Sequence, residues 1–144
     1  MRLALAQARL AGQAGEVPVG AVIVLAGQVI GAGANRTRRD GVVHAHAELI
    51  ALGEAERRLG DFRLDDAAMY VTLEPCLMCL GAIHQARLGR LVYGAPEQKF
   101  GALGSRFDLR NAEALKRISI AGGVLAGEAA ALMSEFFRLL REGQ

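Results

Sequence analysis

The chain has 144 residues, of which 52% are hydrophobic and 22% are charged, and its 17 basic and 15 acidic side chains leave a net charge of +2. This length and composition are typical of one globular domain with its own core, and they exclude a disordered chain. A net charge of +2 is far smaller than the positive charge typical of proteins that bind nucleic acids nonspecifically. It does not decide whether this chain binds RNA. We therefore expect a single domain over residues 1–144.

No segment is expected to be a signal peptide or to cross a membrane. Gln7, Arg9 and Gln13 interrupt the apolar start of the chain, which therefore predicts an amphipathic helix. The longest apolar run, residues 17–26, is about half the length of a membrane span. Two cysteines in a chain of this size fit a reducing, cytoplasmic environment.

The first half of the chain predicts a helix, a hairpin and a second helix. Apolar residues recur at helical spacing in residues 1–14, and Gly15 ends that pattern. Residues 19–25 and 28–32 are rich in β-formers and are joined by two residues that include a glycine, which predicts an antiparallel hairpin. A polar, basic loop is expected over residues 35–41, and a helix over residues 46–59.

The second half predicts alternating strands and helices. Strands are expected at residues 69–73, 90–93 and 118–121, and helices from Cys76 to about Arg87 and over residues 125–140. Pro75 is expected at the first helical position, where a missing N–H costs little. Strands that alternate with helices after an initial hairpin predict an α/β fold in three layers, with a mixed sheet of about five strands and helices on both faces.

Two motifs about thirty residues apart carry the chemistry. The first is His46-Ala47-Glu48, and the second is Pro75-Cys76-Leu77-Met78-Cys79. One imidazole and two thiolates are three ligands for a Zn²⁺ ion, which takes four, and the chain contains no further cysteine. The open fourth position predicts a water molecule and therefore catalysis.

The spacing of these residues explains how they could share one ion. Within a helix His46 and Glu48 would point in nearly opposite directions, but from a first turn both can reach a target beyond the helix end. Cys76 and Cys79 are neighbours at the start of the next helix. The ion would then lie between two helix N-termini, whose partial positive charge favours thiolates. Glu48 would move the water's protons without binding the metal.

Three other interpretations remain open at this point. A Cys-x-x-Cys pair at a helix start is also typical of thioredoxin-like redox proteins, although His46 and Glu48 favour the metal. A closed structural zinc site could use His44 as its fourth ligand, which would leave Glu48 without a role. A noncatalytic, zinc-stabilised binding module is the third interpretation.

Beyond the metal motif, several segments resemble bacterial tRNA-specific adenosine deaminases in order and spacing over nearly the whole chain. These segments are Val17–Val22, Ala34–Arg36, His46–Glu48, Tyr70–Cys79, Gly94-Ala95, Lys99–Gly101 and Ser134–Arg138. The resemblance implies a cytidine deaminase-like fold, a homodimer, and zinc-dependent conversion of the wobble adenosine of a tRNA anticodon loop to inosine. Because an anticodon loop is already single-stranded, extruding its base costs little.

The resemblance also implies roles for individual residues, each assigned by matching position. His46, Cys76 and Cys79 would bind zinc, and Glu48 would carry protons. The residues implied to contact the nucleotide and the surrounding loop are Asn35, Glu97, Lys99, Phe137, Arg138 and Arg141.

The chain departs from the family pattern near the expected site at two places, and its first helix also starts later than is typical. The family has an aspartate where this chain has Glu97, whose longer side chain could still accept a ribose hydroxyl. Val42-Val43-His44 replaces the family's Asp-Pro-Thr.

The alternative substrate is a free base or nucleoside of the guanine or cytosine type. The aromatic and basic C-terminal helix favours tRNA, since a small free base needs no outer platform.

Overall fold

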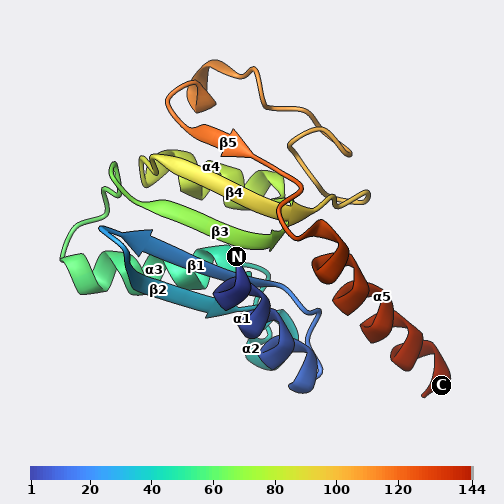
Figure 1. The fold of residues 1–144 in the computed structure, drawn as a ribbon. Coiled ribbons are helices and arrows are strands. Elements are labelled where there is room, and N and C mark those ends of the chain that lie inside the picture. The colour runs from blue at the N-terminus through green and yellow to red at the C-terminus, as the bar shows by residue number, and fades with distance from the viewer. Residues whose placement is uncertain (144) are drawn as a thin grey trace.

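The computed structural model describes residues 1–143 as helices packed on both faces of a five-stranded sheet (Figure 1). The helices are α1 (Arg2–Gln13), α2 (Thr37–Asp40), α3 (Ala47–Leu59), α4 (Leu77–Gln85) and α5 (Ala126–Glu142), with a short 3₁₀ helix at Glu113–Leu115. The strands are β1 (Gly20–Leu25), β2 (Gln28–Ala34), β3 (Ala68–Leu73), β4 (Arg90–Ala95) and β5 (Ser119–Ala121).

The sheet is mixed, as the sequence predicts. Its strand order is β2-β1-β3-β4-β5, with β1 antiparallel to both of its neighbours and β3, β4 and β5 parallel to one another. The predicted hairpin is confirmed: Ala26 and Gly27 join β1 to β2, and their φ angles of 50° and 77° are those that a two-residue turn of this kind requires.

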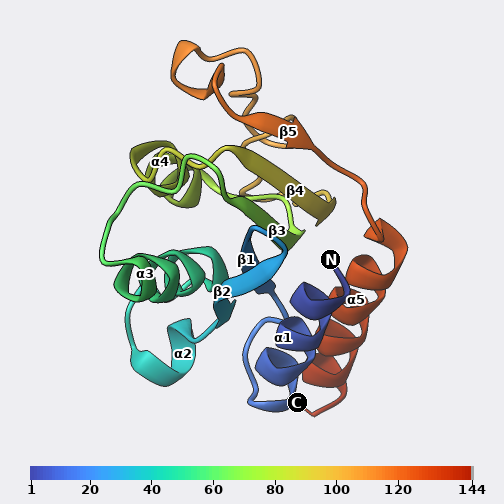
Figure 2. The same cartoon turned by 60° about the vertical axis from the view of Figure 1, so that its left-hand side comes forward.

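Helices α3 and α4 cover one face of the sheet, and α1 and α5 cover the other (Figure 2). The larger core lies under α3 and α4. Its buried side chains include Ala21, Ile23, Met69, Val71 and Leu91 from the strands and Ala47, Ala51, Leu80 and Ile83 from the helices. A smaller core around Leu5, Ala95 and Ala129 lies under α1 and α5. Within residues 1–143, no helix combines the length and the apolar character needed to span a bilayer.

Helix α3 lies against β2 with almost no side chain between them. A Cβ atom at Gly33 would overlap the carbonyl oxygen of Ala47, and one at Gly31 would overlap that of Ala51. Ala47, Ala51 and Ala55 have no exposed surface. Only glycine in the strand and alanine in the helix permit this approach, which fixes the height of α3 above the sheet.

Residues 35–41, predicted to be a loop, contain the short helix α2. Two N–H groups at the start of α2 are hydrogen-bonded by a residue outside the helix. Arg38 N and Arg39 N donate to the carboxylate of Glu16 at 3.1 and 2.6 Å. Glu16 is only 1% exposed. A helix of four residues shows no apolar periodicity, and the partner that stabilises it lies about twenty residues upstream.

The predicted place of Pro75 is wrong. Cys76, with ψ at 174°, is the N-cap residue of α4, so Pro75 precedes the helix instead of opening it. The Pro75 carbonyl accepts a hydrogen bond from Ala102 N at 2.9 Å, which ties this residue to the loop after β4. The helix also ends at Gln85, because Arg87 has a positive φ of 58°.

Candidate functional site

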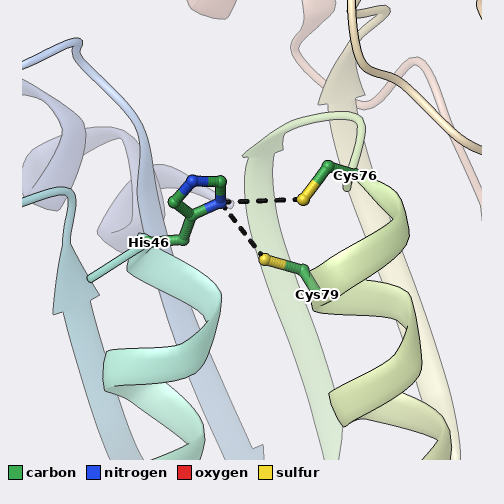
Figure 3. A group of neighbouring side chains, drawn as sticks. All are labelled: His46, Cys76 and Cys79. Atoms are coloured by element: carbon green, nitrogen blue, oxygen red, sulfur yellow. Dashed lines mark hydrogen bonds between the residues drawn. The ribbon is translucent and has the colours of Figure 1, made fainter. Parts of the chain in front are cut away.

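His46, Cys76 and Cys79 meet between the first turns of α3 and α4 (Figure 3). Cys79 Sγ lies 3.4 Å and Cys76 Sγ lies 3.7 Å from His46 Nδ1. The three ligand atoms all lie within 4.8 Å of one another. The structure thus brings together the residues that the two motifs single out.

The helix starts place these side chains. His46 is the N-cap residue of α3, with ψ at 148°, so its extended backbone turns the imidazole past the helix end. Cys76 takes the same place on α4, and Cys79 follows in the first turn. The sequence predicts His46 inside the helix, whereas it lies one residue before it. Both helix N-termini point their free N–H groups toward the cluster, where they favour negative charge on the sulfur atoms.

The spacing of the cluster fits a tetrahedral metal ion. A zinc ion bound at about 2.0 Å to nitrogen and about 2.3 Å to sulfur separates its ligand atoms by roughly 3.5 Å. The two nitrogen–sulfur distances, 3.4 and 3.7 Å, bracket that value. His44 is exposed and does not belong to this cluster of the described chain, so the closed site that would use it as a fourth ligand does not match the geometry.

The two thiols and the imidazole perturb one another. The pKa of Cys76 is lowered to about 4, because the Cys79 thiol donates a hydrogen bond to its sulfur and His46 lies beside it, although burial opposes the shift. Donating that bond and being buried raise the pKa of Cys79. The bond with Cys76 also raises the pKa of His46. One sulfur of the pair therefore ionises readily, as a metal ligand must.

Glu48 lies in the first turn of α3 and is 4% exposed. Burial raises the pKa of its carboxyl, and the nearby His46 offsets part of that shift. Its side chain lines the same cavity as His46 and Cys76. A buried carboxyl with a raised pKa beside a cavity is suited to accept a proton and to give it back.

The cavity above the cluster has a volume of about 680 Å³. Four of the residues predicted to contact substrate line it, namely Asn35, Glu97, Lys99 and Phe137. Sequence reasoning assigned no role to the remaining lining residues, which are Val17, Val19, Thr37, Val43, Ala47, Leu73, Glu74, Met78, Phe100 and Met133. Met133 is one helical turn before Phe137 on α5, so helical spacing from Phe137 was the signal that could have found it.

Arg138 and Arg141 are not among the residues that line the cavity. The Arg138 guanidinium is held on the surface of α5 by two carboxylates, with contacts to Glu135 at 2.7 and 3.0 Å and to Glu142 at 2.7 and 2.8 Å. Arg141 is exposed near the end of the same helix. An RNA phosphate that contacts Arg138 must therefore compete with both carboxylates.

A model of the MafB19-like deaminase family matches residues 1–141. The tRNA-specific adenosine deaminase of Agrobacterium fabrum is 46% identical over 140 residues, with 96% of this chain and 91% of that protein covered. The tRNA(Ile)-lysidine synthase of Deinococcus radiodurans is 50% identical over 139 residues, which are 96% of this chain but 24% of that protein.

A solved structure from work on A-to-I editing by tRNA:A34 deaminases at the wobble position of transfer RNA has the same fold. It matches with a TM-score of 0.86 and 44% identity, over 92% of this chain and 96% of that one. The expected cytidine deaminase-like fold is thereby confirmed. By its matched family, its relatives and its fold, the chain belongs to the MafB19-like deaminases and to the tRNA-specific adenosine deaminases.

Proposed function

We propose that this chain converts the wobble adenosine of a tRNA anticodon loop to inosine by hydrolysis, with zinc held by His46, Cys76 and Cys79. The observation that carries the proposal is that a buried carboxyl, Glu48, and a three-residue metal cluster line one cavity. Two tRNA-specific adenosine deaminases that are 41% and 46% identical to this chain support adenosine in tRNA as the substrate.

Glu48 is the proton carrier in this proposal. When bound, zinc supplies the Lewis acidity that makes a water molecule nucleophilic at neutral pH. Glu48 accepts a proton from that water as oxygen adds to C6 of adenine, and it delivers a proton to the ring nitrogen. Glu48 then transfers the proton of the added hydroxyl to the exocyclic amino group, the bond between C6 and that group breaks, and ammonia leaves inosine behind. General acid–base catalysis of this kind contributes about 10²–10⁴-fold.

The cavity walls would hold the extruded base and its ribose. Asn35, 7% exposed, donates from Nδ2 to the Val17 carbonyl at 3.4 Å, which holds its amide in the wall. Glu97 accepts from Lys99 N at 2.8 Å, and both residues line the cavity. Phe137 gives an aromatic face at the mouth, on which a base can stack. Arg138 and Arg141 would meet phosphates of the loop outside the cavity.

We further propose that residues 1–144 work as one deaminase domain in a cytoplasmic homodimer. Large apolar side chains that are exposed in the single chain, such as Val43, Leu77 and Phe107, support association with a second copy. The reduced thiols that the metal cluster needs, together with a tRNA substrate, support the cytoplasm. Light scattering at micromolar concentration would test the dimer.

One experiment tests the function directly. The zinc-loaded protein is incubated with an anticodon stem-loop carrying adenosine at the wobble position and, separately, with free adenosine, guanine and cytosine. We expect inosine in the stem-loop and no detectable reaction of the free compounds. Efficient release of ammonia from guanine or cytosine, with the stem-loop unchanged, would replace the proposal with the free-base alternative.

A further inference from the structure

Glu74 is a buried carboxylate with no part in the proton transfers described above. It lies between the end of β3 and the ligand Cys76, is 3% exposed, and lines the cavity. Its own N–H donates to the Ala95 carbonyl at 2.9 Å, which fixes its backbone against the end of β4. A buried carboxylate is costly unless hydrogen bonds compensate it, so its partners indicate its role.

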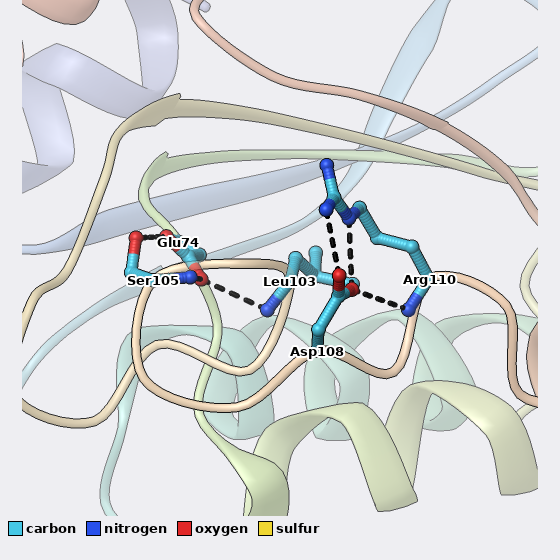
Figure 4. A network of polar contacts seen from close by, with 5 residues as sticks. All are labelled: Glu74, Leu103, Ser105, Asp108 and Arg110. Atoms are coloured by element: carbon cyan, nitrogen blue, oxygen red, sulfur yellow. Dashed lines mark hydrogen bonds and ion pairs between the residues drawn. The ribbon is translucent and has the colours of Figure 1, made fainter.

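Within residues 1–143, the four donors to the Glu74 side chain come from one loop, residues 97–105. Figure 4 shows Leu103 and Ser105 around the carboxylate. Oε1 accepts from Glu97 N at 3.2 Å and from the hydroxyl of Ser105, and Oε2 accepts from Leu103 N at 2.8 Å and Ser105 N at 3.2 Å. The two oxygens thus accept about as many bonds as a carboxylate can. Burial acts to raise the pKa of Glu74, but the bonds from Ser105 and Leu103 outweigh it and leave the pKa below its usual value.

The loop closes tightly around this carboxylate. A Cβ atom at Gly101 would overlap the carboxyl group of Glu74, so only glycine fits there. The backbone of Gly101 also pairs with Cys76, and Ala102 N donates to the Pro75 carbonyl at 2.9 Å. A carboxylate that follows this loop, Asp108, contrasts with Glu74, because it is exposed and pairs with the exposed Arg110 at 2.6 Å.

The same loop carries one wall of the cavity, formed by Glu97, Lys99 and Phe100. These residues line the same cavity as Asn35 and the metal ligands His46 and Cys76, and the backbone of the loop connects them to Glu74. Glu97 is the closest link, since its N–H donates to Glu74 while its side chain accepts from Lys99 N.

We propose that Glu74 is a positioning residue that holds the substrate wall, residues 97–100, at a fixed distance from the metal ligands. The residue joins the two halves of the site, because its backbone precedes Cys76 and its side chain holds the wall. This inference rests on the proposed function for the identity of the substrate, but the hold of Glu74 on the loop can be measured without any substrate.

Glu74→Gln is the sharpest variant, since it keeps the shape of the side chain. Whichever way the new amide is turned, at least one backbone N–H of the loop faces an NH₂ group in place of an acceptor. Thr72→Val is the matched control. Thr72 is 1% exposed, and its hydroxyl accepts a hydrogen bond at 3.2 Å from Gly20 N, which belongs to β1 and not to the loop.

Hydrogen exchange measured by mass spectrometry reads the loop directly. In Glu74→Gln we expect the amides of residues 97–105 to exchange about tenfold faster, while those of α4 stay within about twofold of wild type. Thr72→Val should leave both segments unchanged. Unchanged exchange of residues 97–105 in Glu74→Gln overturns the proposal. If that variant does not fold, Ser105→Ala replaces it in the test. This variant removes one donor to Glu74, so the amides of residues 97–105 should exchange about threefold faster.

Kinetics and zinc analysis complete the test. We expect Glu74→Gln to keep the wild-type zinc content, to raise KM for the stem-loop about tenfold and to change kcat by less than about threefold, because substrate binding is the step affected. Loss of zinc without loosening of the loop would make Glu74 a support of Cys76 and overturn the proposal. If the wild-type protein leaves the stem-loop unreacted, the proposed function fails, and the exchange experiment still decides on Glu74.

Discussion

Cys79 Sγ and His46 Nδ1 are 3.4 Å apart, although 33 positions separate the two residues in the chain. The contact exists because each residue belongs to a helix start and the starts of α3 and α4 lie next to each other. A metal ion at this place would join α3 to α4, so the stability of the fold and the occupancy of the site are expected to change together.

The first prediction concerns the metal. Cys79→Ser replaces a thiolate by a poor zinc ligand, so the purified variant should contain little zinc and unfold about 5 °C or more below wild type. Elemental analysis and thermal denaturation measure the two effects. His84→Ala, in the last turn of α4 and outside the cluster, is the control and should keep its zinc. A full complement of zinc in Cys79→Ser would contradict the assignment.

The second prediction separates proton transfer from metal binding. Glu48→Ala should keep its zinc and its fold while turnover of the stem-loop falls by about 10²-fold or more, because the proton carrier is gone and the ligands are intact. Single-turnover kinetics with zinc analysis test this. His44→Ala should leave both quantities near wild type. If Glu48→Ala stays active and His44→Ala does not, the proton carrier is His44.

The third prediction concerns the mouth of the cavity. Phe137→Ala should lower kcat/KM for the stem-loop about tenfold, since stacking of one base on an aromatic ring contributes about 1–3 kcal/mol. Leu139→Ala is matched to it, because Leu139 is on the same helix and 53% exposed but does not line the cavity. Zinc content and circular dichroism should not change in either variant. Equal losses in both would mean that Phe137 acts through helix packing alone.

The fourth prediction follows from the pairing of Arg138 with Glu135 and Glu142. The double variant Glu135→Gln, Glu142→Gln frees the guanidinium for a phosphate. It should bind the stem-loop more tightly, and the slope of log K against log salt should steepen by about 0.7–0.9. Glu54→Gln with Glu113→Gln makes the same change in net charge away from α5. If that pair has the same effect, general charge explains the gain and Arg138 does not contact RNA.

Features that depend on neighbouring residues were predictable from the sequence. Ala26-Gly27 between two β-rich segments predicts a hairpin because positive φ angles are needed at just such a connection. The metal cluster was predictable for a similar reason: His46, Cys76 and Cys79 can share an ion only if they stand at helix starts, and the strong helix pattern after His46 places one of those starts.

Features that depend on distant partners were not predictable. Proline is acceptable both at a first helical position and just before an N-cap. The hydrogen bond that the Pro75 carbonyl accepts from Ala102 N is a long-range contact that favours the second place. Helix α2 depends on Glu16, and the role of Glu74 depends on donors 23 to 31 positions away. Local sequence patterns do not indicate such bonds, because the donor and the acceptor lie in segments that are far apart in the chain.

The close approach of Gly33 to Ala47 has a consequence for evolution and engineering of the site. Ala47 directly follows the ligand His46, so the spacing between strand and helix sets how far the imidazole stands from the two sulfur atoms. A single methyl group at residue 33 would push the start of α3, and with it His46, away from the sheet. Cys76 and Cys79 on α4 would stay in place. Residue 33 is therefore expected to tolerate less variation than many residues that touch the substrate, although it never meets substrate or metal.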